Sequence, residues 1–385
     1  MRKTPTLVLA VLATVATACS SGGGSESGPA PAGSAEPSAA AATATPTESD
    51  CATDYLAGLT MRQKLGQLLT VGVTGVDDAA NVVGTEQVGG IFIGGWTDEA
   101  LLSGGQLEQI KQSADSGLMV TIDEEGGRVS RVSDLIGEAP SARQAAQTMS
   151  ADEFYDASVT RGRALKDLGI TVDFAPDVDV SDQPDDSVIG DRSFSDDPEK
   201  VTEYADAQIR AFHEVGIGAV IKHFPGHGHG SGDSHTGGVE TPPLDQLQDV
   251  DLEPFRQLVG SGAGVMVGHL DVPGLTEPDV PASISPQAMA LLRQGSGYNA
   301  EPFDGPIFTD DLGGMAAISD RLPIPDAVET ALEAGADNAL WISSDAVPQV
   351  LDQLEEAVSA GRLSSAQVDA SVLRMAKFKG VPTGC

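Results

Sequence analysis

Four of the chain's six histidines lie in one short stretch, residues 222–235, whose sequence is KHFPGHGHGSGDSH. Such a density suits either a metal site or acid–base chemistry. Binuclear zinc hydrolases use a compact H-x-H-x-D-H spacing. The spacing in this chain is H-x-H-x3-D-x-H, formed by His227, His229, Asp233 and His235. The many glycines also give metal ligands little second-shell support. We therefore expect no metal and no cofactor, with a mononuclear metal site as the alternative.

Asp233 and His235 in this stretch are suited to proton transfer. In an extended segment, residues at positions i and i+2 project to the same side. The carboxylate can then hold one imidazole nitrogen and leave the other to carry a proton. The alternative is that both are solvated loop residues, but Lys222 and His223 at the neighbouring strand end favour a site.

A carboxylate for covalent chemistry follows another apolar run, IFTDDLGG, which contains Asp310 and Asp311. A carboxylate at a strand end can act as a nucleophile or as an electrostatic stabiliser. Adjacent residues of a strand point to opposite sides, so we expect only one of the two to face a site. The other fits the N-cap and acidic first turn of a following helix.

Two further clusters combine carboxylates with arginines. The segment DEEGGRVSR places Asp123 at the end of an apolar run and Arg128 and Arg131 after a Gly-Gly turn, and IGDRSF contains Asp191 and Arg192. If these groups converge, they suit a ligand rich in hydroxyls and carbonyls, such as a sugar. Taken singly, each cluster also resembles an ordinary surface ion pair.

Short β-rich runs alternate with helical patterns after residue 50, and several helical patterns end in the glycine typical of a helix C-terminus. The runs cover residues 68–73, 89–95, 118–123, 170–178, 218–224, 264–272, 305–311 and 338–345. This pattern predicts the α/β class and a single-domain (β/α)8 TIM-type barrel, with a doubly wound open sheet as the alternative.

Polar residues close these apolar runs. Active sites of such barrels are built at the C-terminal ends of the strands, so we expect the closing residues to face one mouth. They are Asp123, Asp177, Lys222, His223, His269, Asp271, Asp310 and Asp311.

The N-terminus has the pattern of an export signal. A basic start is followed by an apolar run from Leu7 to Ala16 and by small residues before Cys19. That run is shorter than the roughly 20 residues of a membrane-spanning helix. Small residues before a cysteine resemble a bacterial lipobox, which implies a signal peptide at residues 1–18 and a lipid on Cys19. Residues 19–50, rich in Gly, Ser, Ala and Pro, read as a flexible linker to a domain at 51–385.

The formal net charge of −35 and the pI near 4.2 exclude nucleic acid as a partner, because the phosphate backbone would be repelled. We expect an exported monomer on the extracytoplasmic face of the cell membrane, attached only through its lipid. In that compartment Cys51 and Cys385 suggest a disulfide that closes the ends of the domain, and two unpaired thiols are the alternative.

In this order, the segments DEEGGRVSR, DRSF, KHFPGHG, DSH and FTDDLGGM resemble the N-terminal barrel domain of glycoside hydrolase family 3, in its β-N-acetylglucosaminidase branch. The resemblance spans about residues 55–345. It implies that Asp310 is the catalytic nucleophile, His235 the acid/base and Asp233 its partner. The sugar-binding positions that it implies are Asp123, Arg131, Arg192, Lys222 and His223.

The resemblance also implies an activity. A retaining exo-acting β-N-acetylglucosaminidase would remove terminal β-linked N-acetylglucosamine, and an exported, anchored form would act on peptidoglycan fragments or muropeptides. The chain departs from the family in its glycine-rich loop with an extra His229 and in a second glycine before Met315. It also leaves no room for the second α/β sandwich domain of many members, so we expect a single-domain form.

Two alternatives remain open from sequence. One is a tethered sugar-binding lipoprotein without turnover, against which the intact set of Asp310, Asp233 and His235 argues, since a binding protein needs no nucleophile. The other is a phosphorolytic enzyme, because a neutral histidine repels phosphate less than a carboxylate does.

Overall fold

The structure is a computed structural model that describes residues 48–383, with side chains from residue 52 onward. The predicted signal peptide, Cys19, the linker up to residue 47 and Cys385 lie outside the described residues, so the anchor and the disulfide stay predictions. Within the described part, no helix has the length and apolar character needed to cross a membrane.

Eight parallel strands close into a barrel in the order β1-β10-β9-β7-β5-β4-β3-β2, which confirms the predicted (β/α)8 architecture. Each predicted β-rich run contributes one strand to the barrel. Their bounds are β1 Leu69–Gly72, β2 Gly90–Ile93, β3 Met119–Ile122, β4 Val172–Asp173, β5 Gly218–Phe224, β7 Gly264–Val267, β9 Ile307–Asp311 and β10 Asn338–Trp341.

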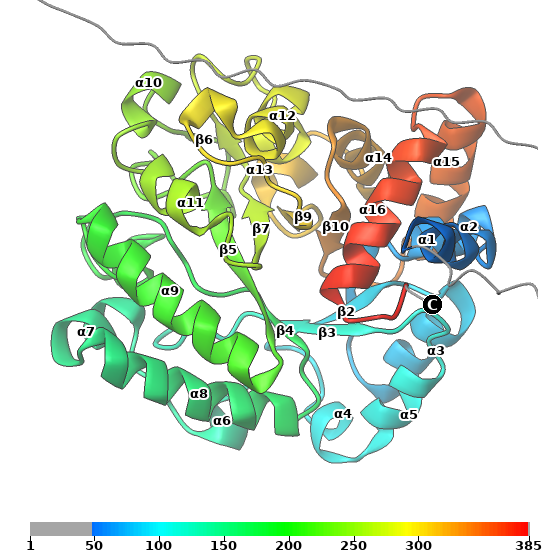
Figure 1. The fold of residues 1–385 in the computed structure, drawn as a ribbon, viewed down its shortest axis with the longest axis horizontal. Coiled ribbons are helices and arrows are strands. Elements are labelled where there is room, and N and C mark those ends of the chain that lie inside the picture. The colour runs from blue at the N-terminus through cyan, green and yellow to red at the C-terminus, as the bar shows by residue number, and fades with distance from the viewer. Residues whose placement is uncertain (1–47, 384–385) are drawn as a thin grey trace, which may run out of the picture. The chain divides into compact units, whose positions relative to one another are not determined.

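Helices surround the strands, as the ribbon shows (Figure 1). Their bounds are α1 Glu48–Ala57, α2 Met61–Gly66, α3 Val76–Glu86, α4 Ala100–Ser103, α5 Gln106–Gln112, α6 Ser133–Ile136, α7 Ala142–Thr148, α8 Ala151–Asp167, α9 Pro198–Val215, α10 Leu244–Leu247, α11 Leu252–Leu258, α12 Pro286–Gln294, α13 Ala316–Ser319, α14 Ile324–Ala334, α15 Val347–Ala360 and α16 Ser365–Phe378. Helix α16, in red, contacts α1, in blue, so the two ends of the described chain are neighbours (Figure 1).

Local sequence explains where the two longest helices begin and end. Ser150 and Glu153 form a capping box at the start of α8. Asp197 caps α9 by accepting a hydrogen bond from the Glu199 N–H, and Gly216 ends α9 in a left-handed conformation at φ 77°. Both helices pack together beside strands β4 and β5, which carry part of the site (Figure 1).

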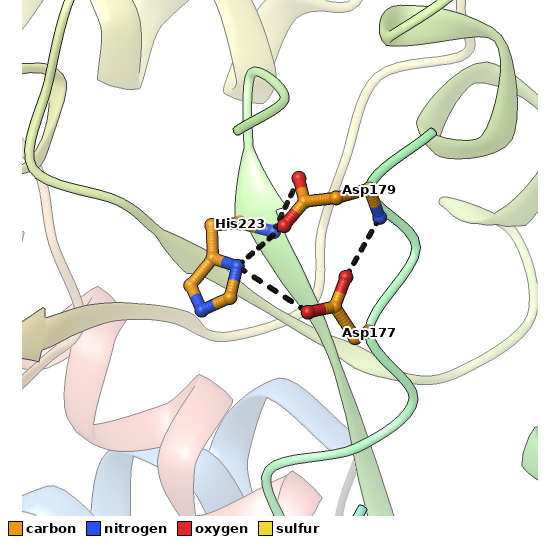
Figure 2. Close-up of side chains that lie close together, drawn as sticks. All are labelled: Asp177, Asp179 and His223. Carbon is orange, nitrogen blue, oxygen red and sulfur yellow. Dashed lines mark hydrogen bonds and ion pairs between the residues drawn. The ribbon is translucent and has the colours of Figure 1, made fainter. Parts of the chain in front are cut away.

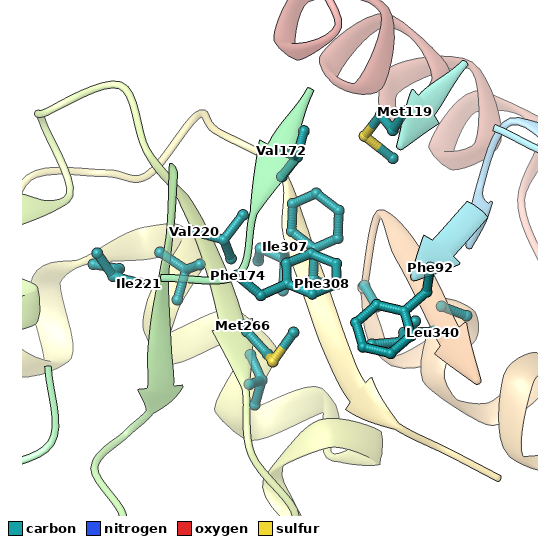
Figure 3. Close-up of a cluster of buried hydrophobic side chains, with 14 of the residues drawn as sticks. Phe92, Met119, Val172, Phe174, Val220, Ile221, Met266, Ile307, Phe308 and Leu340 are labelled. Atoms are coloured by element: carbon teal, nitrogen blue, oxygen red, sulfur yellow. The ribbon is translucent and has the colours of Figure 1, made fainter. Parts of the chain in front are cut away.

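Large apolar side chains fill the inside of the barrel (Figure 3). Phe174 lies between Phe92 and Phe308, with ring centroids 6.0 and 5.6 Å away, and all three are buried. Burying such a side chain contributes about 1.5–3 kcal/mol. The barrel interior is therefore a packed core, and ligands have access only at its ends.

Every predicted run except residues 218–224 extends beyond its strand, and the difference is largest for two of them. The run at 170–178 ends its strand at Asp173, because Pro176 has no N–H with which to continue the ladder. The run at 264–272 breaks at Gly268, whose carbonyl accepts the Leu270 N–H in a tight turn. The chain then forms β8 (Leu270–Asp271), which pairs with β6 (Val239–Glu240) in a separate small sheet.

Candidate active site

The C-terminal mouth of the barrel holds a pocket of about 260 Å³. Of the residues predicted to be catalytic or to bind sugar, all except Asp233 line it: Asp123, Arg131, Arg192, Lys222, His223, His235 and Asp310. A larger pocket of about 720 Å³ is lined by residues at the starts of strands, such as Met119, Val172 and Gly218. Active sites of these barrels lie at the opposite, C-terminal end, so we assign the chemistry to the smaller pocket.

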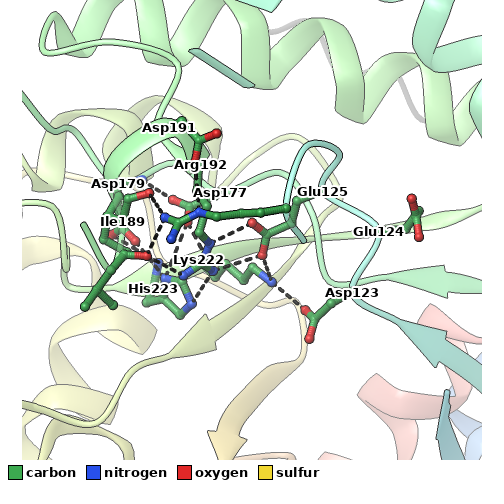
Figure 4. Close-up of polar contacts among 12 residues, drawn as sticks. Asp123, Glu124, Glu125, Asp177, Asp179, Ile189, Asp191, Arg192, Lys222 and His223 are labelled. Atoms are coloured by element: carbon green, nitrogen blue, oxygen red, sulfur yellow. Dashed lines mark hydrogen bonds and ion pairs between the residues drawn. The ribbon is translucent and has the colours of Figure 1, made fainter. Parts of the chain in front are cut away.

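The floor of this pocket is a network of buried, paired charges (Figure 4). The Lys222 Nζ lies 2.5 Å from Asp123 Oδ1 and 2.5 Å from Glu125 Oε1. Arg192 meets both oxygens of Glu125, at 2.8 and 2.9 Å. Burial alone would lower the pKa of Lys222, but the two carboxylates raise it above its ordinary value. Lys222 is therefore a fixed cation at neutral pH.

Glu125 stays ionised for the matching reason. Burial would raise the pKa of this carboxyl, but Arg192 and Lys222 lower it well below its ordinary value. Charge-assisted bonds of this kind are short and geometrically specific. The floor thus presents donors and acceptors in a fixed arrangement before any ligand arrives.

His223 extends the floor, with its ring directed at Asp177 and Asp179 (Figure 2). Its Nδ1 lies 2.7 Å from Asp179 Oδ2, and its Nε2 lies 3.3 Å from Arg192 Nη2. Burial lowers the pKa of His223, which favours the neutral ring. Because arginine can only donate, Nε2 accepts and Nδ1 donates to Asp179.

Asp177, Asp179 and His223 bring three potential ligand atoms within 4.8 Å of one another, as a cation site would. The guanidinium of Arg192 already lies 3.3 Å from Asp177 Oδ2. It supplies the positive charge that a metal ion would otherwise provide. These residues therefore fit a support for His223 better than a metal site.

Two neighbouring pairs, Lys222–His223 and Asp310–Asp311, both line the pocket, although adjacent strand residues should alternate. Each pair lies where the strand register shifts by one residue, between Ile221 and Phe224 on β5 and beside Asp311 on β9. A bulge inserts an extra residue and re-aims side chains. The prediction that only one aspartate faces the site was therefore wrong.

Asp310 and Asp311 differ in what surrounds them. Burial would raise the pKa of Asp310, but His269 and His223 and the Asp311 N–H, which donates to it at 2.8 Å, lower it. Burial raises the pKa of Asp311 to about 6. The Asp311 carboxylate accepts the backbone N–H groups of Gly313 and Gly314 at 2.8 and 2.9 Å. Asp310 is thus the ionised, available carboxylate, and Asp311 caps the turn that follows.

Asp233 and His235 form the expected pair at the rim, but they do so in a turn and not in the extended segment that was predicted. Asp233 Oδ1 lies 2.7 Å from His235 Nδ1 and accepts the His235 backbone N–H at 2.9 Å. Burial would raise the pKa of Asp233, but these bonds lower it, so the carboxylate is ionised. The His235 side chain is 62% exposed and lines the pocket. Its Nε2 is the nitrogen that remains for a substrate.

Three residues predicted to face the mouth do not line the pocket, which corrects the prediction for them. Asp177 lies behind Arg192. His269 is buried, with Nδ1 2.6 Å from Ser283 Oγ and Nε2 donating to the Asp311 carbonyl at 2.8 Å, so it supports the end of β9. Asp271 lies on β8, outside the barrel, and its Oδ2 is 3.7 Å from Nη2 of Arg321.

Arg128 and Asp191, also singled out as candidates, pair with each other at 2.9 Å. Arg128 further donates to the carbonyls of residues 187–189. This contact fastens the loop that carries Arg192 and makes no direct contribution to the pocket lining.

Three of the pocket residues that sequence reasoning missed have a polar or aromatic side chain suited to a function. Glu125 bridges both cations of the floor, and its only signal was a third acidic residue in DEE. His227, weighed only as a metal ligand, is buried with no hydrogen-bond partner for either ring nitrogen. Trp96 is one of two tryptophans in the chain and lines the same pocket.

The model of the glycosyl hydrolase family 3 N-terminal domain matches residues 60–378, further toward the C-terminus than the motifs indicated. The chain is 55% identical over 329 residues to the β-hexosaminidase LpqI of Mycobacterium tuberculosis, an alignment that covers 85% of this chain and 84% of that protein.

Solved structures agree. A family 3 glycosyl hydrolase from Mycobacterium smegmatis is 56% identical, with a TM-score of 0.83 over 84% of this chain and 98% of that one. A family 3 β-N-acetylglucosaminidase from Paenibacillus is 32% identical, with a TM-score of 0.77 over 85% of this chain and 64% of that one. The chain therefore belongs to glycosyl hydrolase family 3 and is a glycoside hydrolase.

Proposed function

We propose that the chain is a retaining, exo-acting β-N-acetylhexosaminidase that removes terminal, non-reducing β-linked N-acetylglucosamine. One observation carries the proposal: a single small pocket combines an ionised Asp310, a fixed polar floor and the Asp233–His235 pair at its rim. The β-hexosaminidase and β-N-acetylglucosaminidase activities named for its relatives support the choice of sugar.

In the first step, the Asp310 carboxylate attacks the anomeric carbon and the bond to the leaving oxygen breaks. The His235 imidazolium gives its Nε2 proton to that oxygen. The product is a covalent glycosyl–Asp310 ester. Asp233 holds Nδ1 and thereby keeps Nε2 directed at the substrate, in addition to stabilising the imidazolium.

In the second step, water attacks the anomeric carbon of the ester and gives its proton to the neutral His235 Nε2. The bond to Asp310 breaks and the carboxylate returns. Two displacements leave the sugar with its original β configuration. Exposure of His235 suits this step, because water must reach it.

The floor would hold the sugar during both steps. Asp123 and Glu125 offer acceptors, and Arg192 and Lys222 offer donors, which matches a ring of hydroxyl groups. Arg131 adds a cation whose Nη2 lies 3.7 Å from Asp123 Oδ2. Groups fixed in advance need little reorganisation as charge develops in the transition state.

The signal peptide, the lipid on Cys19 and the Cys51–Cys385 disulfide belong to the same proposal. A lipid-anchored enzyme outside the cytoplasmic membrane meets peptidoglycan fragments or muropeptides as N-acetylglucosamine-containing substrates. The large negative net charge keeps nucleic acid away.

The proposal is tested with an aryl β-N-acetylglucosaminide. We expect the enzyme to release the phenol and the β anomer of the sugar, which proton NMR would detect before mutarotation. The rate of release should be the same with and without inorganic phosphate. Initial release of the α anomer would refute retention. Formation of a sugar phosphate would establish phosphorolysis.

The absence of a metal requirement is tested separately. EDTA should leave the rate unchanged, because every proposed step uses side chains of the chain. Loss of activity in EDTA with recovery on added zinc would give Asp177, Asp179 and His223 a metal-binding role.

A further inference from the structure

Among the residues that the structure describes, Trp96 is the one large hydrophobic residue that is exposed, at 46%. It also lines the catalytic pocket. It lies in the loop that follows β2. Single exposed apolar residues are common on protein surfaces and usually have no function. The position and the support of this residue distinguish it from that background.

The Trp96 ring is held in place. A Cβ on Gly94 would lie 2.4 Å from ring atoms Cη2 and Cζ2, so the indole rests directly on the Gly94 backbone, which only glycine permits. The ring centroid lies 6.0 Å from that of Phe92. Thr97, which is buried, pins the turn by accepting the Gly94 N–H and donating to the Val73 carbonyl.

The size of the pocket determines what can reach this ring. Its volume of about 260 Å³ lies below the roughly 300–1,000 Å³ of pockets for drug-sized ligands. It has room for one sugar, held by the buried charges of the floor. His235 at the rim protonates the oxygen that joins this sugar to the next group. Whatever follows that oxygen must therefore extend toward solvent, and Trp96, at 46% exposure, is the aromatic residue of the pocket lining that solvent reaches.

We propose that Trp96 is a stacking platform for the leaving group, and that this leaving group is itself a sugar. This proposal rests on the proposed function. The apolar C–H face of a sugar ring packs on an aromatic face, and tryptophan offers the largest such face with a ring already fixed. The enzyme would then favour disaccharides and longer glycans over glycosides with small leaving groups.

The kinetic test compares two substrates with the same terminal N-acetylglucosamine: its methyl β-glycoside and its β-1,4-linked disaccharide. In W96A, the ratio of kcat/KM for the disaccharide to that for the methyl glycoside should fall about 10-fold, mainly through KM. W96F should restore most of the ratio. E99A is the matched control, because Glu99 is exposed on the same loop and does not line the pocket.

A binding test uses the D310N variant, which should bind without turnover. Of the chain's two tryptophans, Trp341 is fully buried, so a fluorescence change on adding the disaccharide would report Trp96. We expect this change to be larger with the disaccharide than with N-acetylglucosamine, and to disappear in D310N with W96F.

An unchanged substrate ratio in W96A would overturn the proposal, and an equal loss on both substrates would in addition place Trp96 at the cleaved sugar. An equal fluorescence response to both sugars would also overturn the proposal. If the wild-type chain cleaves neither substrate, the proposed activity fails, while the fluorescence titration still decides whether Trp96 stacks on a disaccharide.

Discussion

The floor of the pocket is buried, whereas the glycine-rich loop at its rim, which carries His227 to His235, ends in an exposed catalytic pair. On the floor, Lys222 is 2% exposed and each charge has a buried partner of opposite sign. On the loop, His235 is 62% exposed and its partner Asp233 is 35% exposed. Recognition of hydroxyl groups benefits from charges fixed during folding. Proton exchange with a departing oxygen and with water needs an accessible group.

The loop is nevertheless anchored at several points below its tip. The His227 N–H donates to Asp179 at 2.6 Å, and the Ser231 N–H donates to the Glu240 carbonyl at 2.8 Å. A Cβ on Gly228 would lie 1.9 Å from the Val180 carbonyl oxygen, so glycine is required for this close approach. The glycine-rich sequence thus allows tight docking of a loop whose catalytic end is exposed.

The largest expected effect on activity comes from replacing Asp310, the nucleophile that both the floor and the rim loop assist. Asp310→Ala should lower kcat by about 10⁴–10⁶-fold, because no other carboxylate replaces the covalent step. A fluorinated slow substrate should label Asp310 in the wild-type chain, as peptide mapping by mass spectrometry would show. Since Asp311 is engaged by two backbone N–H groups, labelling at Asp311 would contradict the assignment.

The rim loop should show a dependence on the leaving group. His235→Ala should slow cleavage of substrates with poor leaving groups by about 10²–10⁴-fold, because these need protonation of the departing oxygen. With an activated phenol, the first step needs no such help, so the intermediate should accumulate and appear as a burst in stopped-flow absorbance. Asp233→Ala should lose part of the same factor.

Thermal stability separates this result from a structural effect. The melting temperature of His235→Ala should stay close to that of the wild-type chain, since the ring is exposed. Equal loss on good and poor leaving groups, without a burst, would mean that His235 positions the sugar and that the acid is another residue.

The floor should respond in the opposite way. Glu125→Gln removes the charge shared by Arg192 and Lys222, and breaking a buried pair costs about 3–5 kcal/mol. Each cation keeps a second carboxylate, so we expect about 3 kcal/mol and a melting temperature lower by about 5 °C in calorimetry. KM should rise as well.

The matched control is Glu99→Gln, which removes the same charge from an exposed position. A stability of Glu125→Gln equal to that of the control would show that Glu125 does not hold Arg192 and Lys222 in place before a ligand binds.

The pKa of Glu125 is lowered in the folded chain. The stabilisation that Glu125 gives to the fold is therefore present above its unfolded pKa near 4.3, and it is lost only as pH falls through the folded pKa.

Sequence predicted the barrel and seven pocket residues because those signals are local. Eight apolar runs and the motifs DSH and FTDD are legible from the order of residues alone. The missed features depend on packing. Two bulges let both members of the pairs Lys222–His223 and Asp310–Asp311 line the pocket. These bulges depend on the register of β5 and β9 against their neighbouring strands. The tight turn at Gly268 that removed Asp271 leaves no periodic signal.

Ion-pair partners were equally out of reach of sequence. Glu125 and Arg192 are 67 positions apart, and acidic residues are abundant in this chain, so nothing in the order of residues selects one partner over another. Trp96 was missed because its exposure follows from how the β2 loop folds over Gly94.

The smallest expected effect concerns how the loop is fastened. His229, which lies in the glycine-rich loop, places its Nδ1 2.9 Å from Oδ1 of the buried Asp251. The hydrogen bond to Asp251 raises the pKa of His229 against burial, and Asp182 and Asp179 add to the effect. A raised histidine pKa stabilises the fold below the unfolded value near 6.5, and this stabilisation disappears as pH rises through the folded pKa.

His229→Gln should therefore lower the melting temperature by about 2 °C or less at pH 5.5, since the ring is 37% exposed and solvent weakens the pair. The difference should vanish at pH 8.5. In a double-mutant cycle with Asp251→Asn, the second substitution should add little to the first at pH 5.5, because both remove the same contact. A difference that persists unchanged at pH 8.5, or strict additivity of the two substitutions, would mean that the loop is held by its backbone contacts alone.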